Sequence, residues 1–309
     1  MGVVIPALNE AGAIADIITQ VQRVLRDFKL SVVVIDGGST DNTVQIVQNL
    51  GIPVLRQSRE GYGDALSIGF TYVCQEMQSE ILVMLDADGT YDPKDIPRLL
   101  EPLLAGEADI VLGNRFPRSE PESMTAVNRT GNHLISLLTS RLFGVDVSDT
   151  QCGMRAFFAD LVPLFKGEAT GMSYATEMLI DAHQAGARIA ERDIAYKPRI
   201  GKTKLNPLKD GASILGIILR LLRDYKPLLF FGGLGLAFMI SGLIFGFAAI
   251  REWLLFGTVT KTATAILTAL LMIVGVQFFS IGLVADMIKG VRLQVRSQER
   301  AWIKRMLLK

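Results

Sequence analysis

Two carboxylates stand almost side by side directly after an apolar run, in the sequence Asp86-Ala87-Asp88 that follows ILVML (81–85). If that run is a strand, both acids lie at its carboxyl end, where they repel each other unless a cation joins them. Hard divalent cations such as Mg²⁺ prefer carboxylate and phosphate oxygens. The alternative is that Asp88 only caps the turn into the next helix. The pair therefore predicts a divalent cation site, at which a nucleoside diphosphate could be neutralised.

Short polar segments follow the first three apolar runs as well. They contain Pro6, Asn9 and Glu10, then Asp36 with Gly37 and Gly38, then Gly61 with Tyr62 and Gly63. Glycines in such segments let backbone N–H groups approach a ligand closely, although ordinary turns use glycine in the same way. If the runs are parallel strands, these segments meet at the edge that Asp86 and Asp88 share.

The elements that must position these residues alternate in type. Apolar runs predict strands at 2–6, 31–36, 53–57, 81–85 and 109–113, and amphipathic segments predict helices at 11–28, 41–50, 62–78 and 93–104. Such alternation is typical of an α/β domain with a mostly parallel sheet and helices on both faces. Ligands of such sheets bind beyond the carboxyl ends of the strands.

The alternation changes after residue 114. Further elements are predicted as helices at 124–143 and 173–185, an edge strand at 155–158 and a strand at 188–196. We expect these elements to complete one domain over residues 1–209.

An amphipathic segment and two apolar segments follow the predicted domain. The segment 210–226 combines an apolar side with basic residues, which predicts a helix at a membrane interface. Residues 228–250 and 262–285 contain no charged residue, and at about 1.5 Å per residue each can cross a hydrocarbon layer about 30 Å thick. Buried core helices are the alternative, but they seldom lack a polar face over such a length. The sequence therefore predicts a transmembrane hairpin at 227–288 and a tail at 289–309.

Charge is distributed unevenly along the chain. The tail, 289–309, has seven basic residues and one acidic residue, whereas the whole chain has a net charge of +1. The domain before the spans is therefore mildly acidic, which argues against a nucleic-acid binder. The basic tail suits an anionic membrane surface, although a solvated charge run is the alternative. Basic residues also precede the first span, so the positive-inside rule predicts an integral membrane protein whose domain and tail both lie in the cytoplasm.

Five motifs occur in a fixed order along the chain. They are IPALNE (5–10), IDGGSTDNT (35–43), MLDADGTYDP (84–93), LGNRF (112–116) and DTQCGMRAF (149–157). Together they resemble glycosyltransferase family 2, and more narrowly its dolichyl- and polyprenyl-phosphate glycosyltransferase branch, over about residues 1–205. The resemblance implies a Rossmann-like, nucleotide-sugar-binding domain of the GT-A type. It also implies inverting transfer of a sugar from GDP-mannose, UDP-glucose or UDP-N-acetylglucosamine to a dolichyl or polyprenyl phosphate, giving a β-linked product.

The resemblance implies roles for individual residues on the donor side. Donor binding is expected of Pro6, Asn9, Glu10, Asp36, Gly61 and Asp86. Asp86 and Asp88 would hold Mg²⁺ or Mn²⁺, with Thr90 as a weaker metal contact or one made through water. Two positions depart from the family pattern, because Gly37 replaces a second acid and Thr90 replaces a glutamine. Recognition of the base and ribose therefore stays open.

The acceptor side calls for different chemistry. A hydroxyl nucleophile needs a general base, whereas a phosphate monoester, with a second pKa of about 6, is largely ionised at neutral pH. Such an acceptor needs positioning, which arginine provides through paired hydrogen bonds. Candidate cations are Arg115, Arg129, Arg155, Arg199 and Lys202. By the resemblance, Arg115 and Arg129 would hold the acceptor phosphate, together with Arg199 and Lys202 of a basic loop before the membrane.

Glu177 occupies roughly the position at which processive relatives have a catalytic acid. We interpret it as a member of the catalytic site that orients the basic cluster rather than as an obligatory base.

Two alternative functions are considered. A processive polysaccharide synthase normally carries the motif QxxRW, but this chain has only QERAW at 298–302, and two spans are few for a sugar-chain channel. A non-catalytic, membrane-tethered scaffold is the other alternative, which the intact acidic pair disfavours. Gly242 and Gly246 form a small-residue pair in the first span, which predicts packing against the second span or a homo-oligomer.

Overall fold

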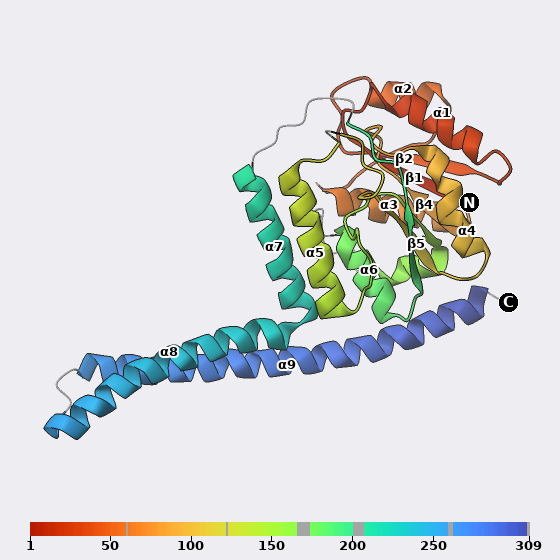
Figure 1. The fold of residues 1–309 in the computed structure, drawn as a ribbon. Helices are drawn as coiled ribbons and strands as arrows, with labels where there is room; N and C mark the ends of the chain where they lie inside the picture. The colour runs from red at the N-terminus through yellow and green to blue at the C-terminus, as the bar shows by residue number, and fades with distance from the viewer. Residues whose placement is uncertain (60, 122, 166–173, 200–206, 259–261, 308–309) are drawn as a thin grey trace. The chain divides into compact units, whose positions relative to one another are not determined.

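The computed structural model describes residues 1–59, 61–121, 123–165, 174–199, 207–258 and 262–307, and for 207–215 and 292–307 it describes the backbone alone. The chain divides into two compact units, one of residues 1–214 with 296–309 and one of residues 215–295 (Figure 1). The first unit contains the α/β domain, and the second contains most of two long apolar helices.

Strands and helices alternate through the α/β domain. The strands are β1 (Gly2–Ala7), β2 (Ser31–Asp36), β3 (Val54–Arg56), β4 (Ile81–Met84), β5 (Ile110–Asn114), β6 (Arg155–Phe158) and β7 (Ile189–Asp193). The helices are α1 (Ile14–Val24), α2 (Thr43–Asn49), α3 (Tyr62–Gln75), α4 (Ile96–Leu104), α5 (Ala126–Phe143) and α6 (Tyr174–Gln184), with short 3₁₀ helices η1 (Pro93–Asp95) and η2 (Ala159–Leu164). The five strands predicted from apolar runs are all present.

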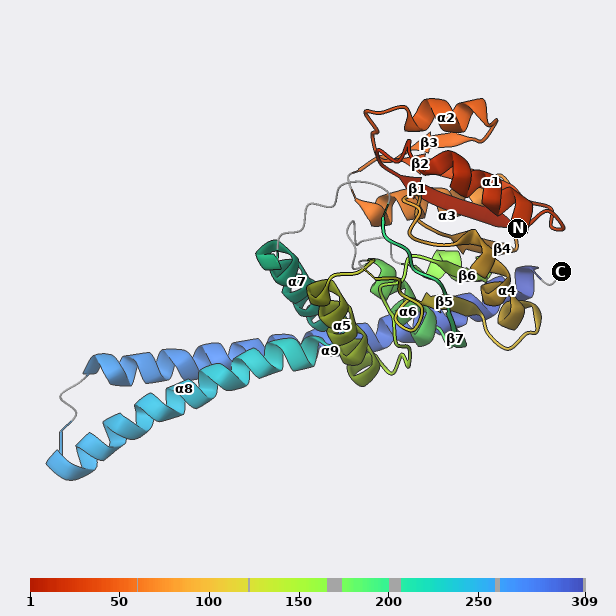
Figure 2. The ribbon, with the colours of Figure 1, turned by 45° about the horizontal axis from the view of Figure 1, so that its top comes forward.

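Within the described residues the strands form one seven-stranded sheet in the order β3-β2-β1-β4-β6-β5-β7 (Figure 2). β1 pairs in parallel with both β2 and β4, and β5 pairs in parallel with β7. β6 is antiparallel to both of its neighbours, β4 and β5. The predicted α/β class with a mostly parallel sheet is therefore confirmed.

The edge position predicted for the strand at 155–158 is wrong. β6 lies between β4 and β5, and its first three residues are buried. A short run that begins with arginine resembles an exposed edge, but the Arg155 guanidinium donates hydrogen bonds to three backbone oxygens. These are the oxygens of Thr150, Cys152 and Ala175. They satisfy a buried charge that the sequence groups with the candidate cations for the acceptor phosphate.

Helices pack on both faces of the sheet, because side chains alternate along each strand. On one face, Val3 and Ile5 of β1 join α1, α2 and α4 in one apolar cluster. On the other face, α3 packs against β1 and β2. A Cβ added at Gly69 of α3 would lie 2.3 Å from Val4 Cγ1, so only glycine lets this helix approach the sheet so closely.

Three neighbouring parallel strands end at the same edge of the sheet. Ala7, the last residue of β1, is in register with Asp36, the last residue of β2. Met84, the last residue of β4, is in register with Val4 on the other side of β1. The polar segments that follow these strands therefore leave the sheet side by side, as the sequence predicts.

Two long helices follow the α/β domain. They are α8 (Pro227–Phe256) and α9 (Thr262–Leu307), and α7 (Pro207–Tyr225) contains the boundary between the units. In the described part of the chain, two segments are long and apolar enough to cross a membrane, Pro227–Phe256 and Thr262–Val291, with mean hydropathies of 2.2 and 2.3.

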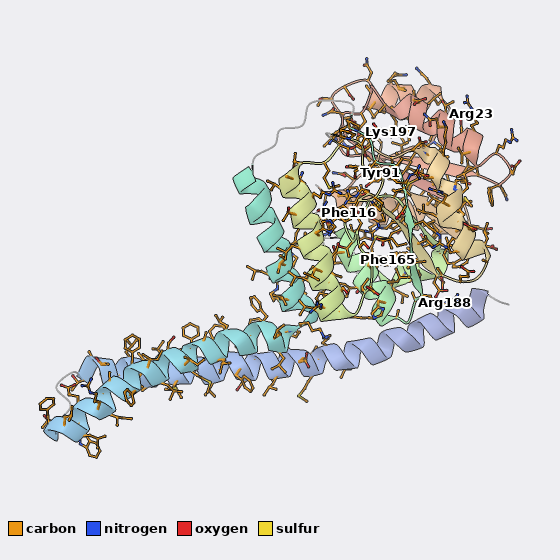
Figure 3. The ribbon with its side chains drawn as sticks, in the orientation of Figure 1. Arg23, Tyr91, Phe116, Phe165, Arg188 and Lys197 are labelled. Atoms are coloured by element: carbon orange, nitrogen blue, oxygen red, sulfur yellow. The ribbon has the colours of Figure 1, made fainter. Side chains whose placement is uncertain are left out.

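Exposure distinguishes these segments from core helices. Only 17% and 11% of their most apolar stretches are buried, and their side chains project outward along both helices (Figure 3). This disfavours the alternative of two buried core helices. α9 continues as one helix of 46 residues, so its backbone stays helical through most of the predicted tail.

Small residues line the contact between α8 and α9. A Cβ added at Gly235 would lie 2.6 Å from the backbone oxygen of Gly275, and one added at Gly246 would lie 2.9 Å from Thr268. A Cβ at Gly242 would lie 3.2 Å from a side chain of α9. The predicted pair, Gly242 and Gly246, thus packs against the second apolar helix of the same chain.

We predict that Gly235→Ala destabilises the helical hairpin, whereas Gly233→Ala does not. The first substitution drives a methyl group into the backbone of α9, which costs about 1–3 kcal/mol, while a Cβ at Gly233 meets nothing within 4 Å. Thermal unfolding of the detergent-solubilised variants measures the difference. Equal melting temperatures for the two variants would contradict the close packing of α8 on α9.

Candidate functional site

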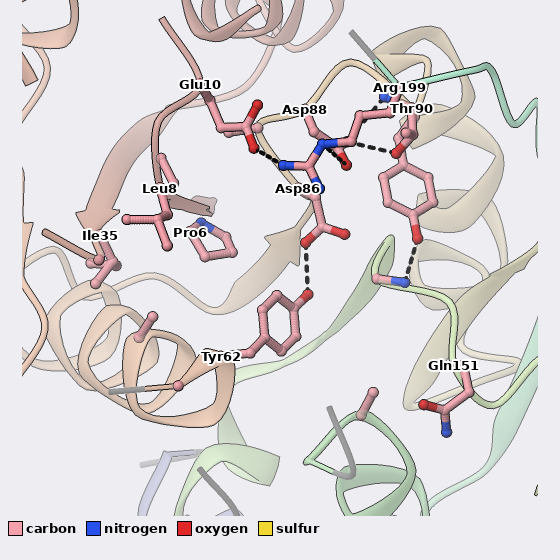
Figure 4. Close-up of a pocket in the computed structure, with 18 of the residues that line it drawn as sticks. Pro6, Leu8, Glu10, Ile35, Tyr62, Asp86, Asp88, Thr90, Gln151 and Arg199 are labelled. Carbon is pink, nitrogen blue, oxygen red and sulfur yellow. Dashed lines mark hydrogen bonds and ion pairs between the residues drawn. The ribbon is translucent and has the colours of Figure 1, made fainter. Parts of the chain in front are cut away.

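A cavity of about 540 Å³ lies where the strand ends meet (Figure 4). Its walls come from the ends of β1, β2 and β4, the first turn of α3, the loop before β6 and the segment after β7. Of the residues predicted from sequence, those that line it are Pro6, Glu10, Gly61, Asp86, Asp88, Thr90, Arg115 and Arg199. The described residues Asn9, Asp36, Arg129 and Glu177 do not line it, and Lys202 lies outside the described residues.

Asp86 lies directly after β4 and opens onto the cavity. Tyr62 Oη donates a hydrogen bond of 2.8 Å to Asp86 Oδ1, and a Cβ added at Gly153 would lie 2.6 Å from Asp86 Oδ2 (Figure 4). Burial raises the pKa of Asp86 to about 6, and the charge of Asp88 adds to the rise, whereas the Tyr62 hydrogen bond opposes it. The carboxyl group is therefore held in one place and has a pKa well above that of an ordinary aspartate.

Asp88 is fixed by the residue two positions on. Its Oδ1 accepts hydrogen bonds from the backbone nitrogen of Thr90 at 3.1 Å and from Thr90 Oγ1 at 2.7 Å. The Thr90 side chain is buried and its hydroxyl is directed at Asp88. Thr90 thus orients the second carboxylate of the acidic pair, which leaves Asp88 Oδ2 toward the cavity side.

Arg199 lies between two carboxylates of the cavity. Its Nη2 bonds Glu10 Oε1, and its Nε lies 3.7 Å from Asp88 Oδ2 (Figure 4). Glu10 is only 7% exposed, so burial raises its pKa, while the Arg199 charge opposes the rise. Arg199 therefore neutralises acids of the predicted donor side, whereas the sequence grouped it with Arg115 and Arg129.

Asn9 and Asp36 shape the wall of the cavity from behind. Asn9 has a positive φ of 59°, and its Oδ1 accepts a hydrogen bond of 2.7 Å from the backbone nitrogen of Thr40. Asp36 accepts hydrogen bonds of 3.0 Å from the backbone nitrogens of Gly38 and Ser39. Asn9 thus ties the segment after β1 to the segment after β2, whereas Asp36 fixes the turn after its own strand, and Gly37 of that turn lines the cavity.

The two arginines predicted for the acceptor phosphate are held differently. Arg115 forms a two-point ion pair with Asp149, with Nε–Oδ2 at 2.6 Å and Nη2–Oδ1 at 2.7 Å. Arg129 is exposed on α5, where its Nη2 bonds the backbone oxygen of Phe116 at 3.2 Å. His133, one turn further along α5, stacks on the Phe116 ring at 3.9 Å between centroids. Only Arg115 of these two lines the cavity.

Arg155 is no part of the basic cluster that the sequence suggests. Its side chain is fully buried inside the sheet. Its guanidinium donates hydrogen bonds to two backbone oxygens of the loop before β6 and to one at the start of α6. It fixes the loop that carries Gln151 and Gly153 into the cavity wall.

Three tyrosines of the cavity were not predicted. Besides Tyr62, Tyr91 Oη accepts a hydrogen bond of 2.7 Å from the backbone nitrogen of Gly153, and the Tyr91 ring lies 5.4 Å from that of Tyr196. The run Gly61-Tyr62-Gly63 attracts notice for its glycines, yet its tyrosine makes the contact with Asp86. A tyrosine between two glycines, after a predicted strand, is the sequence signal that could have identified Tyr62 as a residue of the site.

The residues at the acidic pair fit a divalent cation. Asp86 and Asp88 offer hard carboxylate oxygens, and no group of three or more His, Cys, Asp or Glu side chains among the described residues forms a complete metal cage. Mg²⁺ commonly binds one or two carboxylates and takes its remaining ligands from water and substrate phosphates. The donor set therefore suits an ion that arrives with a phosphorylated substrate.

We predict that Mn²⁺ binding weakens as the pH falls below about 6. A proton and the cation compete for Asp86, so the affinity should drop roughly tenfold per pH unit below that value and level off above it. Tyr62→Phe removes a hydrogen bond that lowers the pKa of Asp86, so it should move the break to higher pH. Electron paramagnetic resonance titration of Mn²⁺ measures both effects.

Tyr72→Phe, on the same helix but outside the cavity, is the matched control and should bind Mn²⁺ like the wild type. Affinity that stays constant between pH 5 and pH 7 would contradict a role for Asp86 in holding the cation.

Comparisons with known proteins agree with this geometry. The model of glycosyl transferase family 2 matches residues 2–163. Glycosyltransferase AglJ of Haloferax volcanii is 32% identical over 286 residues, which are 92% of this chain and 91% of that protein. The dolichyl-phosphate hexose transferase of the same organism is 35% identical over 215 residues, 69% of this chain and 90% of that protein.

A solved structure shares the architecture. Glucosyl-3-phosphoglycerate synthase from Mycobacterium tuberculosis, in complex with Mn²⁺, UDP-glucose and phosphoglyceric acid, matches with a TM-score of 0.57 and 25% identity over 72% of this chain and 78% of that one. The sheet and its cavity are thus those of the GT-A fold. The chain belongs to glycosyltransferase family 2 and is a glycosyltransferase.

Proposed function

We propose that the cavity transfers a hexose, with inversion, from a nucleoside diphosphate sugar to a dolichyl or polyprenyl phosphate. The observation that carries this proposal is the meeting of three carboxylates and two arginines in one cavity. Glu10, Asp86 and Asp88 line it together with Arg115 and Arg199, and Arg199 contacts both Glu10 and Asp88. The acids can bind a cation that neutralises the donor diphosphate, and the arginines can bind the phosphate of the acceptor. A reaction between two phosphorylated substrates needs both roles.

On the donor side, Asp86 and Asp88 would hold Mg²⁺ or Mn²⁺ against the diphosphate. When bound, the ion offsets the charge that develops on the departing nucleoside diphosphate. Tyr62 and Thr90 keep the two carboxylates in place through the hydrogen bonds described above. We assign the nucleoside to the pocket behind Pro6 and Gly61, with Asn9 and Asp36 shaping its wall; the donor is GDP-mannose, UDP-glucose or UDP-N-acetylglucosamine.

On the acceptor side, an ionised phosphate oxygen attacks the anomeric carbon without a general base. Arg115 would contact this phosphate in the cavity, Arg129 would attract it from outside, and we assign Lys202 to the same phosphate by its charge alone. Arg199 would move from the carboxylates to the phosphates once the cation has arrived. Glu177, buried on α6, would act as an orienting partner from behind the wall.

The nature of the acceptor is supported by two observations. A relative of this chain is named as a dolichyl-phosphate hexose transferase, and α8 and α9 expose apolar side chains over lengths that cross a bilayer. We further propose that the α/β domain and the segment after the second span both lie in the cytoplasm, because basic residues flank the spans on that side.

A soluble phosphorylated acceptor is the second candidate. It is favoured by the likeness to glucosyl-3-phosphoglycerate synthase, which was solved with phosphoglyceric acid. The decisive experiment offers farnesyl phosphate and 3-phosphoglycerate as acceptors to the detergent-solubilised chain with Mg²⁺ and each radiolabelled donor. Transfer to 3-phosphoglycerate alone would replace the lipid acceptor in this proposal.

We predict that Asp88→Ala lowers transfer to farnesyl phosphate by roughly 10²-fold or more, because one carboxylate of the cation site is lost. Asp146→Ala, which changes an exposed acid outside the cavity, is the control and should keep full activity. Both variants should melt at the wild-type temperature. Near-normal transfer by a folded Asp88→Ala protein would remove the cation site from the mechanism.

We also predict the stereochemistry of the product. A single in-line displacement inverts the anomeric carbon, so an α-linked donor should give a β-linked lipid phosphate. The one-bond coupling constant between the anomeric carbon and its proton, measured by NMR on the purified product, distinguishes the two anomers for each of the proposed sugars. An α-linked product would require two displacements and would rule out the direct attack proposed here.

A further inference from the structure

Asp149 and Arg115 form a closed ion pair beside the cavity. The Asp149 side chain is fully buried and that of Arg115 is 7% exposed. Asp149 Oδ2 accepts hydrogen bonds from both Arg115 Nε at 2.6 Å and the Arg115 backbone nitrogen at 3.2 Å, while Oδ1 accepts one from Nη2 at 2.7 Å. One carboxylate thus fixes both the backbone and the side chain of the same arginine.

The loop that carries Asp149 is itself anchored. Glu191 of β7 accepts hydrogen bonds from the backbone nitrogens of Ser148, at 3.0 Å, and Asp149, at 2.9 Å. Glu191 therefore fixes the backbone from which the Asp149 side chain extends, independently of the arginine that this side chain binds.

Asp149 occupies only one edge of the guanidinium. Arginine has five N–H donors in one plane, and the ion pair uses those of Nε and one of Nη2. No described residue forms a hydrogen bond with Nη1, and Arg115 lines the cavity. The Tyr196 ring supports the guanidinium from one face, with Cζ 5.1 Å from its centroid. The free donors thus lie in a plane that is already fixed.

The pair changes how Arg115 can bind an anion. Its charge is largely offset by Asp149, so an anion gains little from long-range attraction and depends on the direction of the remaining N–H groups. Directional binding fails when the plane of the guanidinium rotates. The Asp149 carboxylate, which prevents this rotation, is then as important for anion binding as Arg115 itself.

We propose that Asp149 is a positioning residue that holds one edge of Arg115, so that the opposite edge faces the cavity and receives a phosphate group of a substrate. This inference rests on the proposed function. The phosphate can belong to the lipid acceptor or to the nucleoside diphosphate, and the two sources share the same chemistry. Kinetics with each substrate varied in turn tell them apart.

The test compares Asp149→Asn, Asp149→Glu, Arg115→Ala and the double variant Asp149→Asn/Arg115→Ala in the full chain. Asp149→Asn keeps the shape but loses the charge and one acceptor oxygen. We expect it to raise the KM for either farnesyl phosphate or the sugar donor by about tenfold or more, with less than a twofold change in the other KM. Asp149→Glu should recover part of the loss.

The double variant separates positioning from a merely structural role. If Asp149 acts through Arg115, the double variant should be no worse than Arg115→Ala alone, because the two residues work as one unit. Losses that multiply, or unchanged constants in Asp149→Asn, would overturn the proposal. If the wild type transfers no sugar to farnesyl phosphate, the proposed function itself fails. This outcome differs from one in which the wild type is active but the losses of the two single variants multiply in the double variant.

Arg115→Lys covers the case in which Asp149→Asn does not fold. Lysine keeps the charge but has no second edge to present, so it should raise the same KM as Asp149→Asn does. An unchanged KM in a folded Arg115→Lys protein would contradict the directional role of the guanidinium. Arg188→Lys is the matched control, since Arg188 pairs with Asp109 by a similar ion pair away from the cavity.

Discussion

The burial of three carboxylates around one cavity governs this site. Glu10, Asp86 and Asp88 open onto one cavity because they follow strands that end side by side. Burial is the main cause that raises the pKa values of Glu10 and Asp86, and the negative charge of Asp88 adds to both rises. The site is therefore built to attract positive charge, and Arg199 supplies it from within the chain.

The basic residues around the cavity fall into different classes. Arg199 is 43% exposed and contacts acids that also face a cation, so it can exchange partners. Arg115 is buried against Asp149 and cannot move without breaking a two-point ion pair. Arg155 belongs to the interior of the sheet. A count of arginines in the sequence thus overstates how many can turn to bind a substrate phosphate. The acid or carbonyl group that each arginine contacts decides whether it can do so.

The sequence predicted what depends on local pattern. Alternating apolar runs identified the strands, and the acidic pair predicted a candidate cation site that lines the cavity, because strand ends and charged neighbours are visible over a few residues. The contacts of Tyr91 and Asp149 could not be predicted in this way. Tyr91 meets Gly153 and Asp149 meets Arg115 only because β6 enters between β4 and β5. That insertion joins segments far apart in the chain. The sequence predicted an edge strand at 155–158 instead, because nothing local to this run shows that it lies between two other strands.

The antiparallel insertion of β6 also constrains how the chain acquires its fold. β4 and β5 are synthesised before the strand that separates them, so each presents an unpaired edge until residue 158 is available. Non-local strand pairing of this kind is slow, and open edges invite aggregation in the meantime. Assembly of the sheet therefore waits for a late, central strand. A nascent chain stopped before Arg155 carries the four strands β3-β2-β1-β4 and a lone β5, because the other partner of β5, β7, follows still later.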